Sequence, residues 1–239
     1  MALIQVEGLT KRYGAVTAVD DLSFTVAPAT VTGFVGANGA GKSTTLRMIL
    51  GLTRPTSGTA TIDGRPFADL AHPASVVGAM TDPDVFHPRR RGRDALRIPA
   101  RVSGIGDRRV DEVLGLVDLT DAAGRRVGGY STGMRQRLAL AFALLGDPGT
   151  LILDEPANGL DPLGVTWLRG LLRRLAAEGR TVLVSSHGLA ELAQTVDDVV
   201  VIDRGHLVAR GTTAELLGSA GAASLEEAYL SLVTKGEAR

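Results

Sequence analysis

Near the N-terminus, a glycine-rich turn is followed at once by a lysine and a serine, a combination of residue types that can hold a polyphosphate. The segment is Gly36-Ala37-Asn38-Gly39-Ala40-Gly41-Lys42-Ser43, and it fits the pattern G-x-x-x-x-G-K-[ST] at every fixed position. Glycines let the backbone wrap closely around phosphate groups with its N–H groups pointing inward. Lys42 is then expected to reach the β- and γ-phosphates of a nucleotide, and the Ser43 hydroxyl to ligate Mg²⁺. The alternative is an ordinary glycine turn between a strand and a helix.

A second set of chemically active side chains follows two apolar runs later in the chain. Leu151-Ile152-Leu153 leads to the acids Asp154 and Glu155, and Thr181-Val182-Leu183-Val184-Ser185 leads to His187. The carboxyl ends of parallel strands meet at one rim of a sheet, where a phosphate loop also lies. There Asp154 would hold Mg²⁺ through its water shell, Glu155 would polarise a water aimed at the γ-phosphate, and His187 would contact that phosphate. The alternatives are that the acids only cap the next turn and that the histidine is structural.

One of the three tyrosines lies in the polar stretch Lys11-Arg12-Tyr13-Gly14, which predicts a turn. An aromatic face is a good partner for a flat ring, so Tyr13 could stack on a nucleotide base. It could equally cover the edge of a strand, and its position in the sequence does not decide between the two.

The elements that must position these side chains alternate between strand patterns and helix patterns, which is typical of an α/β fold. Val31 to Val35, before the glycine loop, is apolar and β-branched, and Ser43 to Leu50, after it, predicts a helix that Gly51 stops. Further strands are predicted at residues 3–7, 22–26, 59–64, 76–80, 151–155 and 181–185, with a hairpin over 199–209. Further helices are predicted at residues 131–145, 168–177, 189–196 and 214–233.

From Asp82 to about Gly128 the pattern changes, because β-branched runs become rare and arginine becomes frequent. Residues 94–102 and 108–117 predict amphipathic helices, and Pro99 is expected to kink the first helix or to delay its start. We interpret this stretch as a helical subdomain inserted into the α/β core. Arg89-Arg90-Arg91, at its start, is either a solvated surface or a contact with an acidic partner or anionic lipid.

The composition limits the class of protein. The chain has 239 residues, of which 44% are hydrophobic and 22% charged, so it can bury a sizeable core. Lys and Arg total 26, as do Asp and Glu, so no global basic field points to nucleic acid. Because cysteine is absent, disulfides and thiol chemistry are excluded.

No apolar run approaches the roughly 20 residues that span a bilayer. The N-terminus also lacks the pattern of a secretory signal, so any membrane role is expected to depend on a partner.

Taken together and in this order, the motifs resemble those of the ATP-binding subunit of an ABC transporter, and the likeness covers essentially the whole chain. The corresponding segments are an aromatic residue, the phosphate loop, a signature, an acidic strand, a D-loop and a switch histidine. They lie at Tyr13, Gly36 to Thr44, Tyr130-Ser131-Thr132-Gly133-Met134-Arg135-Gln136-Arg137, Leu151 to Pro156, Gly159-Leu160-Asp161-Pro162 and His187.

The resemblance implies a P-loop NTPase (RecA-like) core with an N-terminal antiparallel β part and an inserted helical subdomain. Residues 1–239 would form a single ABC ATPase domain, with the core at 1–82 and 138–239 and a helical signalling subdomain at 83–137. The residues implied to bind ATP are Tyr13, Gly36, Asn38, Gly39, Ala40, Gly41, Lys42, Ser43, Thr44, Ser131, Gly133 and Asp161. The catalytic residues implied are Glu155, His187 and Lys42, and the ligands implied for Mg²⁺ are Ser43, Asp154 and Asp82.

The resemblance also implies two partners. Ser131 and Gly133 of one subunit would face the γ-phosphate of ATP held by a second copy, in a head-to-tail dimer. A separately encoded integral membrane permease would be driven by hydrolysis, which would place the chain in the cytoplasm, peripheral on the inner face of the cell membrane. No nucleic-acid partner is expected.

Two other functions remain open from the sequence. One alternative is a dimer clamp that closes on ATP and hydrolyses it slowly or not at all. Another is a soluble ABC ATPase not linked to transport, which usually carries two cassettes or long coiled coils.

Two residues depart from the family's pattern. Asp82 stands where the family usually has Gln, and it adds negative charge beside the expected Mg²⁺. Thr132 stands where Gly is usual, and it adds a β-branched side chain where close backbone approach is expected. Both departures bear on the rate of hydrolysis more than on the fold. Four features narrow the resemblance to the ATPases of bacterial drug and peptide-antibiotic exporters with ABC-2-type permeases. They are the acid at 82, the segment Phe86-His87-Pro88, the continuation of the signature as Gly-Met-Arg-Gln-Arg, and the tail Ser224 to Leu230.

Overall fold

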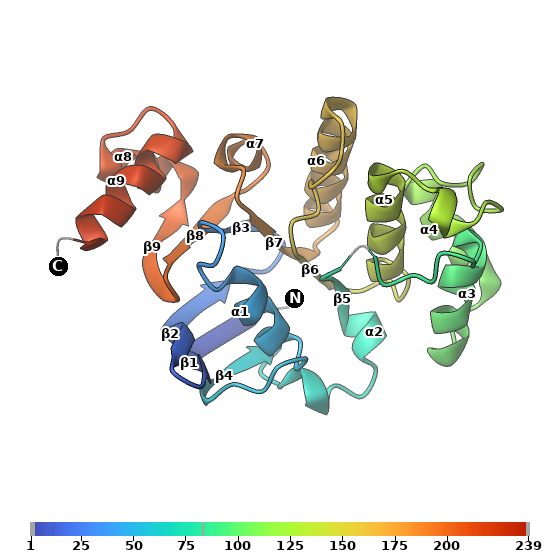
Figure 1. The fold of residues 1–239 in the computed structure, drawn as a ribbon, viewed down its shortest axis with the longest axis horizontal. Coiled ribbons are helices and arrows are strands. Elements are labelled where there is room, and N and C mark those ends of the chain that lie inside the picture. Colours follow the sequence, from blue (N-terminus) through green and yellow to red (C-terminus); the bar gives the residue numbers. More distant parts are fainter. Residues whose placement is uncertain (1–2, 83, 238–239) are drawn as a thin grey trace.

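The computed structural model describes residues 3–82 and 84–237, which form two β-sheets covered by helices (Figure 1). The larger sheet has six strands, and every neighbouring pair is parallel except the last, which is antiparallel. In spatial order these strands are β5 (Val77–Met80), β6 (Thr150–Leu153), β7 (Thr181–Ser186), β3 (Val31–Val35), β8 (Asp198–Asp203) and β9 (His206–Thr212). The spatial order differs from the chain order, so residues from distant segments meet at one rim.

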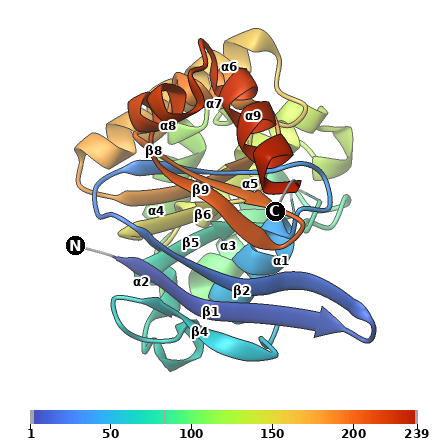
Figure 2. The same ribbon diagram turned by 90° about the vertical axis from the view of Figure 1, so that its left-hand side faces the viewer.

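The smaller sheet is antiparallel and runs along one side of the molecule (Figure 2). Its strands, in spatial order, are β2 (Val16–Val26), β1 (Ile4–Tyr13) and β4 (Ser57–Ile62). β1 and β2 are much longer than the strands predicted at 3–7 and 22–26. The predicted strands were too short because irregularities after Val6 and Leu9 interrupt the alternation of apolar and polar residues on which the prediction relied. Tyr13, predicted in a turn, is instead the last residue of β1 and pairs with Val16.

The larger sheet separates two buried clusters, because successive residues of a strand point to opposite faces. On one face, Ile152 and Leu183 pack with α1 (Lys42–Ile49) and with the inner face of the smaller sheet. There the rings of Phe24 and Phe34 stack with their centroids 5.3 Å apart. This buried layer holds the first turn of α1 against the end of β3, where the glycine loop begins.

On the other side of the larger sheet lie α5 (Thr132–Ala143), α6 (Pro162–Ala177), α7 (Leu189–Ala193), α8 (Thr213–Ala220) and α9 (Leu225–Glu237). Two further helices, α3 (Gly92–Val102) and α4 (Asp107–Leu116), pack against each other and against α5. Short helical turns occur at η1 (Phe67–Asp69), α2 (Pro73–Val76) and η2 (Val127–Gly129). None of the helices in the described part of the chain is long and apolar enough to cross a membrane.

Several helix ends differ from the sequence predictions. α3 starts at Gly92 and continues through Pro99, so the proline does not delay its start. α6 starts at Pro162 rather than at 168, because Asp161 caps it and proline suits the first position of a helix. The predicted helix over 214–233 is two helices, since Gly221, with φ of 64°, ends α8.

The predicted helical insert is a lobe at one end of the molecule, formed by α3, α4 and the start of α5 (Figure 1). Val110, Leu114 and Leu138 are fully buried within it. α5 then leaves the lobe and packs against β5 of the larger sheet. The expected subdomain boundary between residues 137 and 138 lies within α5, and this division stays a proposal.

Candidate nucleotide-binding site

The glycine loop fills the turn between β3 and α1, and its glycines at 36 and 41 leave no space for side chains. A Cβ atom on Gly36 would lie 2.5 Å from the carbonyl oxygen of Ile202 in β8. A Cβ atom on Gly41 would lie 2.6 Å from the carbonyl oxygen of Ala18 in β2, and Gly41 has φ of 101°. The loop is therefore clamped between both sheets, with Asn38 and Gly39 exposed at its tip.

Lys42 is the first residue of α1, and its side chain is buried inside the loop, with only 6% exposed. Its ammonium Nζ donates hydrogen bonds to the carbonyl oxygens of Gly36, at 2.7 Å, and Ala37, at 3.2 Å. It also forms an ion pair with Oε1 of Glu155 at 3.5 Å. A buried charge requires such partners, and this arrangement holds the cation where the loop curves. Ser43 follows and is exposed.

The two acids after β6 are fixed by a single serine from the neighbouring strand. The Ser185 hydroxyl donates to Oδ1 of Asp154 at 2.6 Å and accepts the backbone N–H of Glu155 at 2.9 Å. The backbone N–H of Asp154 donates to the carbonyl of Met80 at the end of β5. Glu155 has φ of 50°, an uncommon conformation for a residue other than glycine, which the surrounding contacts must maintain.

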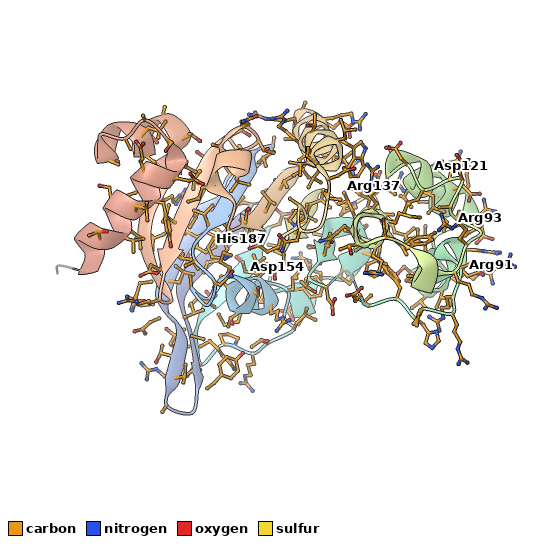
Figure 3. The ribbon with its side chains drawn as sticks, turned by 45° about the horizontal axis from the view of Figure 1, so that its top comes forward. Arg91, Arg93, Asp121, Arg137, Asp154 and His187 are labelled. Atoms are coloured by element: carbon orange, nitrogen blue, oxygen red, sulfur yellow. The ribbon has the colours of Figure 1, made fainter. Side chains whose placement is uncertain are left out.

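The Glu155 carboxylate links two other predicted catalytic residues. Its Oε1 faces Lys42, while its Oε2 lies 2.8 Å from Nδ1 of His187 and 3.4 Å from the backbone N–H of that histidine. Figure 3 labels Asp154 and His187 near the middle of the molecule, at the ends of β6 and β7. Glu155 is 20% exposed and His187 51% exposed, so a water or phosphate can reach both.

Among the residues described, four other predicted site residues form no hydrogen bond or ion pair with the glycine loop, and three of them have local partners. The Ser131 hydroxyl caps α5 by accepting the N–H of Met134, and Oδ1 of Asp161 caps α6. Asp82 is exposed, and its Oδ1 accepts the N–H of Asp84 at 2.8 Å. In the described part of the chain, no hydrogen bond or ion pair joins these three residues, or Gly133, to the glycine loop. Ser131, Gly133 and Asp161, at the starts of α5 and α6, are therefore candidate residues without a contact to the glycine loop of their own chain.

Tyr13 lies at the end of β1, with 52% of its surface exposed. The Lys11 ammonium lies 4.9 Å from the centroid of its ring, which is a cation–π contact. The exposure leaves room for a base, so stacking stays a prediction.

The sequence interpretation missed Gln136, a buried residue of α5 that binds the loop after β6. Its Nε2 donates to the carbonyl oxygens of Asn158, at 2.7 Å, and Glu155, at 3.5 Å. Its Oε1 is buried without a partner in the structure described. Because both neighbouring groups are acceptors, only the amide nitrogen can face them. Gln136 therefore holds together the turn that begins at Glu155.

Two further contacts were not predicted. The Tyr229 hydroxyl of α9 accepts the backbone N–H of Ala37 at 3.0 Å, so the C-terminal helix touches the glycine loop directly. The methyl group of Thr132 lies against Gly159 of its own chain, since a Cβ atom there would be only 2.4 Å from Cγ2. The extra side chain of Thr132 is thus directed at the loop between β6 and α6.

The residues present fit a magnesium ion held together with a nucleotide. Among the residues described, no group of three or more His, Cys, Asp or Glu side chains could hold a metal ion alone. Mg²⁺ usually binds one or two carboxylates and the phosphates of its nucleotide. Ser43 at the start of α1 and Asp154 at the end of β6 supply a hydroxyl and a carboxylate of the required kinds.

The sequence of the chain matches a known protein family. The model of the ABC transporter family matches residues 19–158. The bacitracin transport ATP-binding protein BcrA of Bacillus licheniformis is 43% identical over 209 residues, covering 86% of this chain and 68% of that protein. The Nod factor export ATP-binding protein I of Ralstonia nicotianae is 39% identical over 220 residues, covering 90% of this chain and 68% of that protein.

Solved structures agree with this match. One, described as an ATP binding subunit of an ABC transporter, has a TM-score of 0.87 and 30% identity over 97% of this chain and 99% of that chain. A dimeric bacterial ABC transporter cassette has a TM-score of 0.80 over 87% of this chain and 98% of that chain, but its 24% identity shows the fold alone. The predicted family and P-loop NTPase fold are confirmed. The chain therefore belongs to the ABC transporter family, as one of its ATPase subunits.

Proposed function

We propose that two copies of this chain bind two MgATP head to tail and that hydrolysis drives a separate membrane permease that exports its substrate. The observation that carries the proposal is the Glu155 carboxylate, whose two oxygens face Lys42 and His187. Export is supported by the relatives named for bacitracin transport and Nod factor export. The permease would keep the chain on the cytoplasmic face of the membrane.

Each residue of the site would have a distinct task. The loop N–H groups and Lys42 would neutralise the β- and γ-phosphates. Glu155 would orient the attacking water and accept its proton, and His187 would fix the carboxylate and touch the γ-phosphate. Ser43, Asp154 and Asp82 would hold Mg²⁺, which when bound would offset the phosphate charge. This placement favours hydrolysis over a clamp that only binds ATP, since a base and its orienting group are already in contact.

The second copy would complete each site. Ser131 and Gly133 form no hydrogen bond or ion pair with the glycine loop of their own chain in the part described, and both lie at the start of α5, where N–H groups can meet an anion. We propose that they, with Asp161, act on the ATP of the other copy, while Tyr13 stacks on the base within its own copy.

Cross-linking of single-cysteine variants tests the head-to-tail arrangement, because the chain has no cysteine of its own. The variant Asn38→Cys carries a thiol at the tip of the glycine loop, and Ser131→Cys carries one at the signature. When the two variants are mixed with MgATP and oxidised, we expect a covalent dimer on a non-reducing gel. Each variant alone should remain monomeric on that gel. A mixture without the dimer, or equal dimer with either variant alone, would refute the arrangement.

Replacing Gln136 by methionine is expected to lower kcat about tenfold and to leave the KM for ATP within twofold. The substitution keeps the buried volume but removes the amide that holds the turn at Glu155, and a tenfold change corresponds to about 1.4 kcal/mol of transition-state stabilisation. Thr150→Val is the matched control, since Thr150 is a buried polar residue at the far end of β6 whose hydroxyl also has no partner among the described residues. If kcat falls equally in both variants, Gln136 has only a structural role.

A further inference from the structure

Two arginine-rich segments of the helical lobe run side by side. The backbone N–H of Val127 donates to the carbonyl of Arg90, and that of Gly92 donates to the carbonyl of Arg125. Arg91 and Arg126 form an antiparallel bridge between the segments. This pairing gathers five arginines that are apart in the sequence, and we call them the arginine ribbon. Its members are Arg89, Arg90, Arg91, Arg125 and Arg126.

The ribbon differs from the other arginines of the lobe. All five of its side chains are exposed, and none forms an ion pair with any residue that the structure describes. Arg125 donates one hydrogen bond, to the carbonyl of Gly129. Each of the seven other arginines between residues 89 and 137 does form an ion pair. These are Arg93, Arg97, Arg101, Arg108, Arg109, Arg135 and Arg137. Unpaired positive charge is therefore confined to one place on the lobe.

The fold itself does not offset this charge. Arg91 is the N-cap of α3, and the positive end of a helix repels a cation. Asp121, on the loop that leads to Arg125, forms no ion pair with the ribbon among the described residues. The whole chain carries a formal net charge of +0, so the ribbon is a local excess on a neutral protein. Figure 3 shows Arg91 at the outer end of the lobe, away from Asp154 and His187.

We propose that the arginine ribbon binds the phosphate groups of anionic membrane lipids. A guanidinium group binds phosphate through two parallel hydrogen bonds, and a cluster of basic side chains is attracted to the negative surface of a membrane. Nucleic acid is less well matched, because single strands bind through aromatic side chains between the basic ones, and Tyr130, beside the ribbon, is buried with 4% exposed. The proposal rests on the proposed function only in that a permease brings the chain to a membrane.

The ribbon would give the chain a contact with the bilayer that is independent of the permease. The attraction would weaken as salt screens it, with a decay length of about 8 Å at physiological ionic strength. The ribbon would thereby hold the lobe, and with it the signature at the start of α5, in a fixed orientation to the membrane.

Vesicle sedimentation with the full chain tests the proposal without a permease. We expect wild-type protein to bind vesicles of phosphatidylglycerol and phosphatidylcholine at low salt, and to bind neither pure phosphatidylcholine vesicles nor the mixed vesicles at 0.5 M salt. The triple variant Arg89→Gln, Arg90→Gln, Arg91→Gln should bind the mixed vesicles roughly a hundredfold more weakly, at about 1 kcal/mol for each arginine near an anionic surface. Its Tm should not fall, because the variant removes repulsion at the start of α3.

The matched control is Arg101→Gln, Arg108→Gln, Arg173→Gln, which removes the same net charge from exposed arginines that are ion-paired. Its binding should stay within about fivefold of wild type. Equal loss in the two triple variants, or wild-type binding that does not depend on anionic lipid, would overturn the proposal. Tighter binding of the ribbon to single-stranded RNA than to the vesicles would assign it to nucleic acid instead. Normal ATPase activity without vesicle binding would refute this inference alone and leave the proposed function intact.

Discussion

Replacing Glu155 by glutamine is expected to lower kcat for ATP hydrolysis by about 10²–10⁴-fold, which is the usual contribution of a general base. The amide keeps the size of the side chain and its contact with His187, but it cannot accept the proton of the attacking water. ATP affinity should change little, because the phosphates are held by the glycine loop and Lys42. Since hydrolysis no longer opens the dimer, the variant should accumulate as an ATP-bound dimer.

Steady-state ATPase rates, nucleotide binding and size-exclusion chromatography with ATP check this expectation together. Glu178→Gln is the matched control, because Glu178 is an exposed acid at the end of α6 and, among the residues described, pairs only with Arg180. The control should keep the wild-type rate and stay monomeric under the same conditions. Wild-type turnover by Glu155→Gln would remove Glu155 from the catalytic role and would leave the His187 contact as a structural one.

Replacing Lys42 by alanine is expected to weaken ATP binding by at least about thirtyfold and to reduce hydrolysis as well. Removing one partner from a buried, hydrogen-bonded charge pair costs about 2–5 kcal/mol. Among the residues that the structure describes, Lys42 has three such partners, namely the carbonyls of Gly36 and Ala37 and the carboxylate of Glu155. Without the ammonium, the phosphates of the nucleotide would also approach Glu155 without the charge of Lys42 to offset their repulsion.

Isothermal titration with ATP and a Tm measurement separate a binding defect from a folding defect. Arg47→Ala is the control, since Arg47 lies on the same helix but is exposed near its other end. Its ATP affinity should match wild type. If Lys42→Ala binds ATP as tightly as wild type while its Tm is unchanged, the glycine loop does not cradle the phosphates and the site assignment fails.

Local patterns were enough to predict the elements that carry the chemistry. The glycine loop could be recognised because its residues are adjacent in the chain. The strands before it and before Asp154 could be recognised because all of their residues are buried, so each is a short, continuous apolar run. Prediction was poorer where the pattern depends on pairing with a partner. β1 is interrupted by irregularities that only its register with β2 reveals, and α6 begins at its cap, Asp161, before its apolar stripe begins.

The amino-acid sequence by itself determined which residue types are available for phosphate binding and hydrolysis, because their spacing within each motif is set by covalent geometry. Only the tertiary structure decided which of them meet. The strand order brings β6, β7 and β3 together, and this places Glu155 between Lys42 and His187. The same packing set the contact of Tyr229 with the glycine loop and gathered the arginine ribbon. Contacts between residues far apart in the chain leave no periodic signal in either segment, so they became visible only once the sheets and helices were assembled.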